Sequence, residues 1–188
     1  SIINFDELKD RENYGLSTSL FYDNRNNLLN TSSGSYLRSD IEYNLSRSNY
    51  FRLHFDARKY VTLKNGFILA GRLYNRFTIG EPTFYDYAVL GGDDYVRGYF
   101  YGRYRDKHLS TLQAEIRTPY LWRLGLAVIS GVSTLYDQPS RFTKTVRPNY
   151  GLGLRFLVDK KDKVNLRFDY VLGNDQNSGL YISFGESF

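Results

Sequence analysis

The residues that could do acid–base or metal chemistry are few in this chain. It contains no cysteine, and its two histidines are His54 and His108. His54 lies two positions before Asp56, but the sequence has neither a Gly-x-Ser-x-Gly elbow nor a His-Glu-x-x-His motif. Asp93 and Asp94 lie in a glycine-rich segment that could hold calcium only loosely, and they are expected to be solvated. The sequence therefore predicts a protein that is not an enzyme and that has no catalytic residue, metal or cofactor.

Cations and glycines are concentrated instead in residues 91–108, which hold four glycines, four tyrosines and three arginines. This segment is longer than most connections in compact domains, and it separates two clear strand patterns. A loop of this length and composition is expected to fold back into the interior of a β-barrel, where Arg97 docks. The alternative is that Arg97 is one of many arginines on a polar face.

The elements that must position this loop are β-strands, because apolar and polar residues alternate with a period of two along nearly the whole chain. Near the C-terminus, for example, Val164, Leu166 and Phe168 alternate with Asn165 and Arg167. The stretches expected to be strands are residues 14–24, 35–46, 50–63, 67–78, 109–120, 124–137, 149–159, 163–173 and 179–188, with residues 2–8 as a tenth candidate.

The two faces of these strands fit two classes of fold. One face carries arginine, aspartate and glutamate and the other carries leucine, phenylalanine and tyrosine, as in a soluble β-sandwich or an outer-membrane barrel. The strands are longer than most sandwich strands and match a tilted membrane-spanning strand. Short and long connections also alternate, as they do in outer-membrane barrels. The sequence therefore predicts an all-β, antiparallel transmembrane β-barrel of about ten strands, with eight as the alternative, in which residues 1–188 form a single domain.

Composition argues against several other classes of protein. The mean hydropathy is −0.48, and no run approaches the roughly eighteen apolar residues of a transmembrane helix. The net charge is +5, but basic residues are spread through the strands among acidic ones, so no nucleic-acid partner is expected. Residues 1–4 have neither the charged nor the apolar region of a signal peptide, so an exported chain is expected to be in its mature form.

Three segments resemble motifs of the Omp85 superfamily, which includes BamA and TamA. Val96, Arg97, Gly98 and Tyr99, preceded by two glycines, are similar to the superfamily's sixth-loop motif. Residues 21–34 resemble its D-x-R turn, and residues 179–188 resemble the C-terminal β-signal by which an assembly machine recognises a barrel. The resemblance covers essentially the whole chain and implies the C-terminal portion of the superfamily's barrel, without POTRA domains.

The resemblance implies a lock that holds the loop inside the barrel. In the superfamily the loop arginine meets acidic residues on the inner wall, so Arg97 is expected to pair with Glu115 on the next strand in a charge-assisted contact. The superfamily often places a further aspartate where this chain has Ile129, and Asp56 or Asp169 could replace it. The predicted lock residues are Val96, Arg97, Gly98, Tyr99 and Glu115.

The resemblance also implies a role for the closing strand and for the whole chain. The residues expected to form the assembly signal and one side of a seam are Gly179, Tyr181, Phe184, Gly185 and Phe188, with Phe184 and Phe188 on the apolar face. The chain is expected to lie in the bacterial outer membrane and to assist another polypeptide to enter or cross it. Its expected partners are outer-membrane lipid, the barrel-assembly machinery during biogenesis, and a client polypeptide or a second barrel subunit. The alternative is a structural barrel or membrane anchor that has lost transport.

Overall fold

The computed structural model describes residues 14–45, 49–93 and 95–188. Its main element is one antiparallel sheet of nine strands in the order β1-β2-β3-β4-β7-β8-β9-β10-β11. These strands are β1 (Tyr14–Asp23), β2 (Gly34–Leu45), β3 (Asn49–Thr62), β4 (Ile68–Gly80), β7 (His108–Arg117), β8 (Leu124–Tyr136), β9 (Val146–Asp159), β10 (Val164–Gly173) and β11 (Ser178–Phe184). The long loop adds a pair of two-residue strands, β5 (Ala88–Val89) and β6 (Arg105–Asp106), and three short 3-10 turns lie at Lys64–Gly66, Phe84–Asp86 and Pro139–Arg141.

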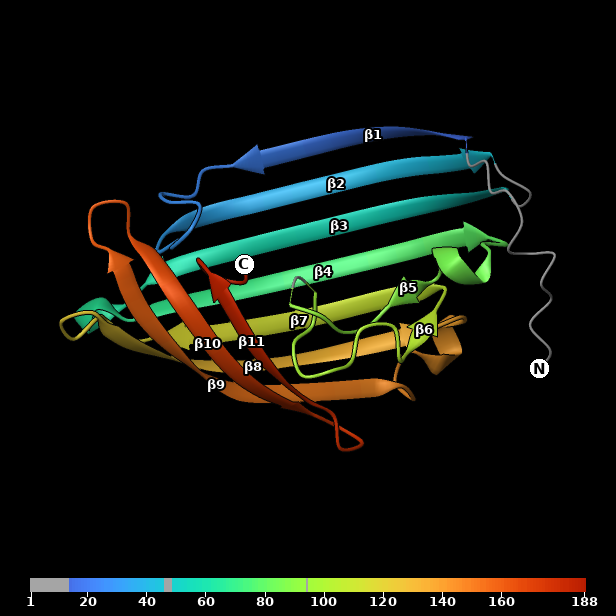
Figure 1. Cartoon of the computed structure of the whole chain (residues 1–188). Coiled ribbons are helices and arrows are strands. Elements are labelled where there is room, and N and C mark those ends of the chain that lie inside the picture. Colours follow the sequence, from blue (N-terminus) through green and yellow to red (C-terminus); the bar gives the residue numbers. More distant parts are fainter. Residues whose placement is uncertain (1–13, 46–48, 94) are drawn as a thin grey trace.

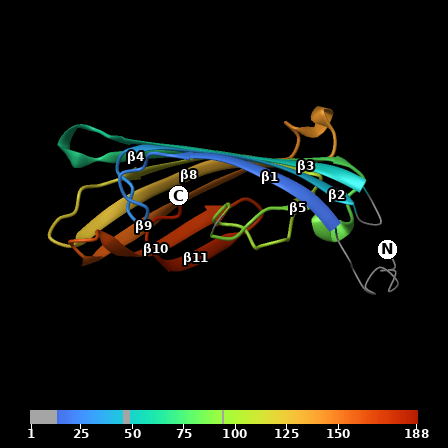
Figure 2. The ribbon, with the colours of Figure 1, turned by 90° about the horizontal axis from the view of Figure 1, so that it is seen from above.

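The sheet curls into a trough. Strands β1 to β4 run along one wall, and β9 to β11 cross in front of them (Figure 1). Seen from above, the long loop with β5 lies between the two walls, and the C-terminus also lies inside the trough (Figure 2). The curvature follows from the right-handed twist that accumulates across many antiparallel strands.

The alternation in sequence becomes two chemically different faces of this sheet. On β10, for example, the side chains of Asn165, Arg167 and Asp169 are buried inside the trough, whereas Tyr170 on the outer face is exposed. Leucine, isoleucine and phenylalanine cover the outer face of the other strands in the same way. No helix in residues 14–45, 49–93 and 95–188 is long and apolar enough to cross a membrane.

The nine stretches predicted as strands between residues 14 and 188 all form strands of the sheet, against a predicted total of about ten with eight as the alternative. The described residues form eleven strands, of which nine belong to the sheet, and residues 2–8 lie outside the described part. The sheet is also open, because within the described part β1 pairs only with β2 and β11 pairs only with β10. The last strand ends at Phe184 and not at the predicted residue 188, because Gly185 has a φ of +76° and turns the chain inward.

One end of the open sheet is nevertheless bridged. The connection between β1 and β2, residues 24–33, is long because it reaches the C-terminal tail, residues 185–188. The amide of Glu186 donates to the carbonyl oxygen of Leu29 at 2.8 Å. In the same connection, the Thr31 carbonyl accepts from Arg117 at 3.2 Å, and the Asn30 amide donates to the hydroxyl of Tyr120 at 2.9 Å. The two edge strands are therefore joined through turn and tail, although they do not pair with each other.

Candidate functional site

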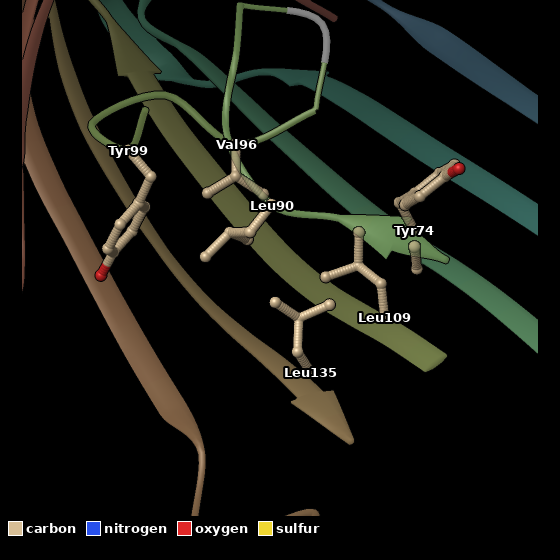
Figure 3. Packing of buried hydrophobic residues seen from close by; sticks show 7 residues of the cluster. Tyr74, Leu90, Val96, Tyr99, Leu109 and Leu135 are labelled. Atoms are coloured by element: carbon tan, nitrogen blue, oxygen red, sulfur yellow. The ribbon is translucent and has the colours of Figure 1, made fainter. Parts of the chain in front are cut away.

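The long loop between β4 and β7, residues 81–107, enters the trough and packs against its inner wall. Apolar side chains anchor it: Leu90 and Val96 of the loop point towards Leu109 of β7 and Leu135 of β8 (Figure 3). The full buried cluster consists of Tyr74, Ala88, Leu90, Val96, Tyr99, Leu109 and Leu135. This packing brings the loop arginine to the centre of the wall.

Arg97 lies between two carboxylates. Its guanidinium donates to Glu115 on β7 and to Asp169 on β10, and its side chain is 1% exposed, while both carboxylate side chains are fully buried. The backbone carbonyl of Arg97 also accepts a hydrogen bond from the side chain of Asn149 on β9, at 3.0 Å. Charge-assisted pairs of this kind fix the orientation of both partners. The loop is thus held by β7, β9 and β10 at once.

The neighbours of Arg97 make close contacts with β10 and β11. Gly98 has a φ of +93°, and a Cβ atom there would lie 3.0 Å from a methyl carbon of Val171, so the backbone approaches β10 as only glycine allows. The amide of Gly98 donates to the hydroxyl of Tyr181 at 2.8 Å. The hydroxyl of Tyr99 donates to the carbonyl of Pro148 and accepts from the amide of Asn174. A predicted lock residue, Gly98, is therefore in contact with a predicted seam residue, Tyr181.

The Arg97 pairs belong to a larger ionic network, which we call the lumen network. It joins four arginines to four carboxylates: Arg97, Arg117, Arg155 and Arg167 with Asp93, Glu115, Asp169 and Glu186. The formal charges balance, which offsets the high cost of removing isolated charges from water. Its members come from the loop, from β7, β9 and β10, and from the tail. Arg155 of β9, for instance, contacts Asp169 and also Glu186 at 3.0 Å.

The C-terminal tail continues this network inside the trough. Phe188 is 3% exposed and packs against Tyr60 of β3 and Ala70 of β4. Its backbone carbonyl accepts from Arg117 at 3.0 Å, and the hydroxyl of Ser187 donates to the carbonyl of the loop residue Asp93 at 3.0 Å. The prediction that Phe188 lies on the apolar outer face is wrong, because the inward turn at Gly185 reverses its orientation.

Three of the other predicted seam residues lie on β11, and the fourth, Gly185, directly follows it. Phe184 is on the outer face and is exposed, whereas Tyr181 faces the interior. Gly179 lies opposite Val171 of β10 in the register. The outer backbone edge of β11 carries no strand in the described part of the chain. The strand with the unpaired edge, β11, is thus followed directly by the tail that turns into the trough.

Sequence reasoning found only part of this site. Of the two candidates for the second carboxylate, Asp169 contacts Arg97, whereas Asp56 pairs with Arg58 and Arg72 on the other wall. Arg117, Arg155 and Arg167 were visible as polar-face residues, but no sequence signal singled them out. Asp93 was expected to be solvated but pairs with Arg167 at 2.6 Å, and Glu186 lies in the tail beyond the last strand, where alternation gave no signal. Within residues 14–45, 49–93 and 95–188, no group of three or more His, Cys, Asp and Glu residues could hold a metal ion.

Comparisons with known proteins agree with this architecture. A solved structure of BamA from Haemophilus ducreyi lacking POTRA domains 1–3 is similar, with a TM-score of 0.71 and 17% sequence identity over 90% of this chain. The match covers 41% of that BamA chain, so this chain spans less than half of its length, and at this identity the likeness shows the fold alone. A comparison with curated protein sequences gives no match. Residues 2–188 match the Omp85 superfamily domain, and the chain therefore belongs to the Omp85 superfamily.

Proposed function

We propose that this chain lies in the bacterial outer membrane and helps another polypeptide to enter or cross it. The observation that carries the proposal is the pair of unpaired strand edges on β1 and β11 in the described part of the chain. A backbone amide or carbonyl left unsatisfied in hydrocarbon is costly, so a sheet in a membrane needs every edge paired. In a membrane each of these edges pairs with a further strand, and a client polypeptide is one source of such a strand.

The outer face of the sheet supports a place in the membrane. Leu20, Ile79, Leu152 and Leu180 are all more than half exposed on it, from strands at both edges and in the middle of the sheet. In water, an apolar surface that continues over a whole sheet would be strongly unfavourable, whereas in a bilayer it is solvated by acyl chains.

In the mechanism we propose, the contacts of the lock residues Arg97 and Gly98 hold the edge strand β11 in a fixed position. A client strand adds to an edge through main-chain hydrogen bonds, which need no particular client sequence. The hydroxyl of Tyr181 ties β11 to Gly98, and the lumen network ties the loop to β7, β9 and β10. These contacts fix the backbone of β11 before a client arrives, so the binding of a client strand does not have to order β11.

A reconstitution experiment tests this proposal. The protein is placed in phospholipid vesicles, an unfolded client barrel is added, and client folding is followed by its heat-modifiable gel mobility. Because the chain has no cysteine, Thr18→Cys on β1 and Ile182→Cys on β11 each give a single reactive thiol at an edge. Leu154→Cys, on the same face of the interior strand β9, is the matched control.

We expect faster client folding than in empty vesicles, and disulfide cross-links to client cysteines from both edge positions but not from Leu154→Cys. An unchanged folding rate together with an absence of edge cross-links would rule out the insertion role.

A structural or anchoring barrel is the second candidate, and one observation favours it. The loop and the lumen network, whose arginines are almost completely buried, fill the trough against β7, β9 and β10, and the polar cavity that remains against β2 to β4 has a volume of only about 530 Å³. A reconstituted protein that assembles stably but neither accelerates client folding nor cross-links to a client would support this role.

A further inference from the structure

The outer face carries a groove that the proposed insertion role does not use. It lies over β4, β7 and β8 and has a volume of about 430 Å³. The apolar side chains that line it are Leu73, Phe77, Leu112, Val132, Phe142 and Val146. These strands are interior to the sheet, so their backbone groups are already paired and offer no edge to a peptide strand. An occupant must therefore bind through side chains.

A row of polar side chains crosses this groove. Asn75 of β4 lies opposite Ser110 of β7, and Ser110 lies opposite Thr134 of β8, all on the same outer face as their leucine and valine neighbours. The hydroxyl of Thr134 donates to the carbonyl of Phe142 at 2.7 Å. The Asn75 amide, in contrast, makes no side-chain hydrogen bond to any residue that the structure describes, although it is only partly exposed. An amide facing hydrocarbon is costly unless the surrounding lipid supplies an acceptor.

Aromatic side chains border the groove on the loop side of this row, and a cation follows them closely in sequence. The rings of Phe77, His108, Tyr136 and Phe142 form a continuous series, with successive centroids 6.0, 5.0 and 5.2 Å apart. Aromatic residues collect where acyl chains meet headgroups. Lys144 is exposed, has no carboxylate partner among the described residues, and is two positions in sequence from both Phe142 and Val146, which line the groove.

We propose that this groove binds one glycerophospholipid with an anionic headgroup. One acyl chain lies along Leu73, Leu112 and Val132. The ester carbonyl oxygens of the lipid accept hydrogen bonds from the Asn75 amide, and the phosphate lies near the ammonium group of Lys144. Apolar side chains and the Asn75 amide line the groove, and Lys144 is next to it in sequence, so each part of the lipid has a side chain of matching chemistry.

Native mass spectrometry of the full chain in detergent, titrated with phosphatidylglycerol, tests the proposal. The wild-type chain is expected to retain one phosphatidylglycerol and to bind phosphatidylcholine more weakly. Asn75→Leu, which removes the amide but keeps a similar shape, is expected to weaken phosphatidylglycerol binding about five-fold, since it removes a hydrogen bond. Leu112→Trp fills the groove and is expected to abolish binding.

The matched control is Leu126→Trp, the same substitution at an exposed outer-face position of β8 that does not line the groove. Its affinity is expected to equal that of the wild type. Heat-modifiable gel mobility verifies that each variant is folded, and if Leu112→Trp does not fold, Asn75→Leu decides the question. Equal affinity of wild type and Asn75→Leu, or equal binding of phosphatidylglycerol and phosphatidylcholine, would overturn the proposal.

Discussion

Replacement of Arg97 by alanine should loosen the whole interior, and the structure allows the size of the effect to be worked out. The side chain is 1% exposed and pairs with Glu115 and Asp169, which are themselves fully buried. Removal of one partner of a buried ion pair costs about 3–5 kcal/mol, because the remaining charge stays buried without compensation.

The lumen network places the expected cost at the lower end of this range. After the substitution, Glu115 still contacts Arg117 at 2.8 Å, and Asp169 still contacts Arg167 at 2.8 Å. Each carboxylate thus keeps a cation, and the network carries one excess negative charge. We expect a loss of about 3 kcal/mol for Arg97→Ala, and a smaller loss for Arg97→Lys, whose ammonium keeps the charge but lacks the planar fork.

The assay is the midpoint temperature at which the folded, fast-migrating form is lost in a heat-modifiable gel. For a chain of this size, a loss of about 3 kcal/mol corresponds to a midpoint about 6–12 °C lower. Arg103→Ala is the matched control, because Arg103 lies in the same loop but contacts neutral groups: it donates to the side-chain amide oxygen of Asn177 at 3.1 Å and lies 5.5 Å from the ring centroid of Tyr104. It is expected to cost about 1 kcal/mol. A midpoint that falls no further for Arg97→Ala than for Arg103→Ala would refute the reasoning.

Three further predictions test the same interior in the same assay. Phe188→Ala empties the buried site against Tyr60 and Ala70 and is expected to cost about 3–5 kcal/mol, and Phe184→Ala on the exposed face much less; equal costs would contradict the buried position of Phe188. Arg97→Ala and Glu186→Gln act on one network, so their joint effect should differ from the sum of the single effects by about 0.5–3 kcal/mol, whereas additive costs would mean that loop and tail are independent. Ile129→Asp places a carboxylate opposite Glu115 and is expected to destabilise the otherwise wild-type chain. In the Asp169→Asn chain, which has lost one negative charge, the same substitution is expected to restore part of the lost stability. A further loss of stability in the Asp169→Asn chain would show that charge balance does not govern the site.

The positions and faces of the strands are predictable from sequence because each depends on local alternation. The pattern around Leu166 and Arg167 is read directly as an outer and an inner face, and β10 forms there with those faces. The pairing of each strand with its chain neighbours follows from the short connections. Closure does not follow, because it depends on whether the first and last strands meet, which no local pattern encodes.

The site was predictable to the extent that it lies on strands. Alternation placed both Asp56 and Asp169 on the inner face, but only the curvature of the sheet brings Asp169 to Arg97 and leaves Asp56 on the far wall. The tail was missed for a different reason. Alternation carried on to residue 188 treats Gly185 as one more strand residue, whereas its positive φ ends the strand and points Phe188 inward.

The contact between Glu186 and Leu29 lies at one end of the gap between the edge strands β1 and β11, so this gap is narrower at that end than at the other. Near this contact, turn and tail hold the margins of the sheet together, and from there β1 and β11 diverge along their length (Figure 1). The gap between β1 and β11 is therefore narrow at the end held by Glu186 and Leu29 and wide at the opposite end. In the proposed insertion role, a client polypeptide that enters between β1 and β11 would meet the wide end of the gap first and advance towards the narrow end, and the contact between Glu186 and Leu29 would be the last to separate.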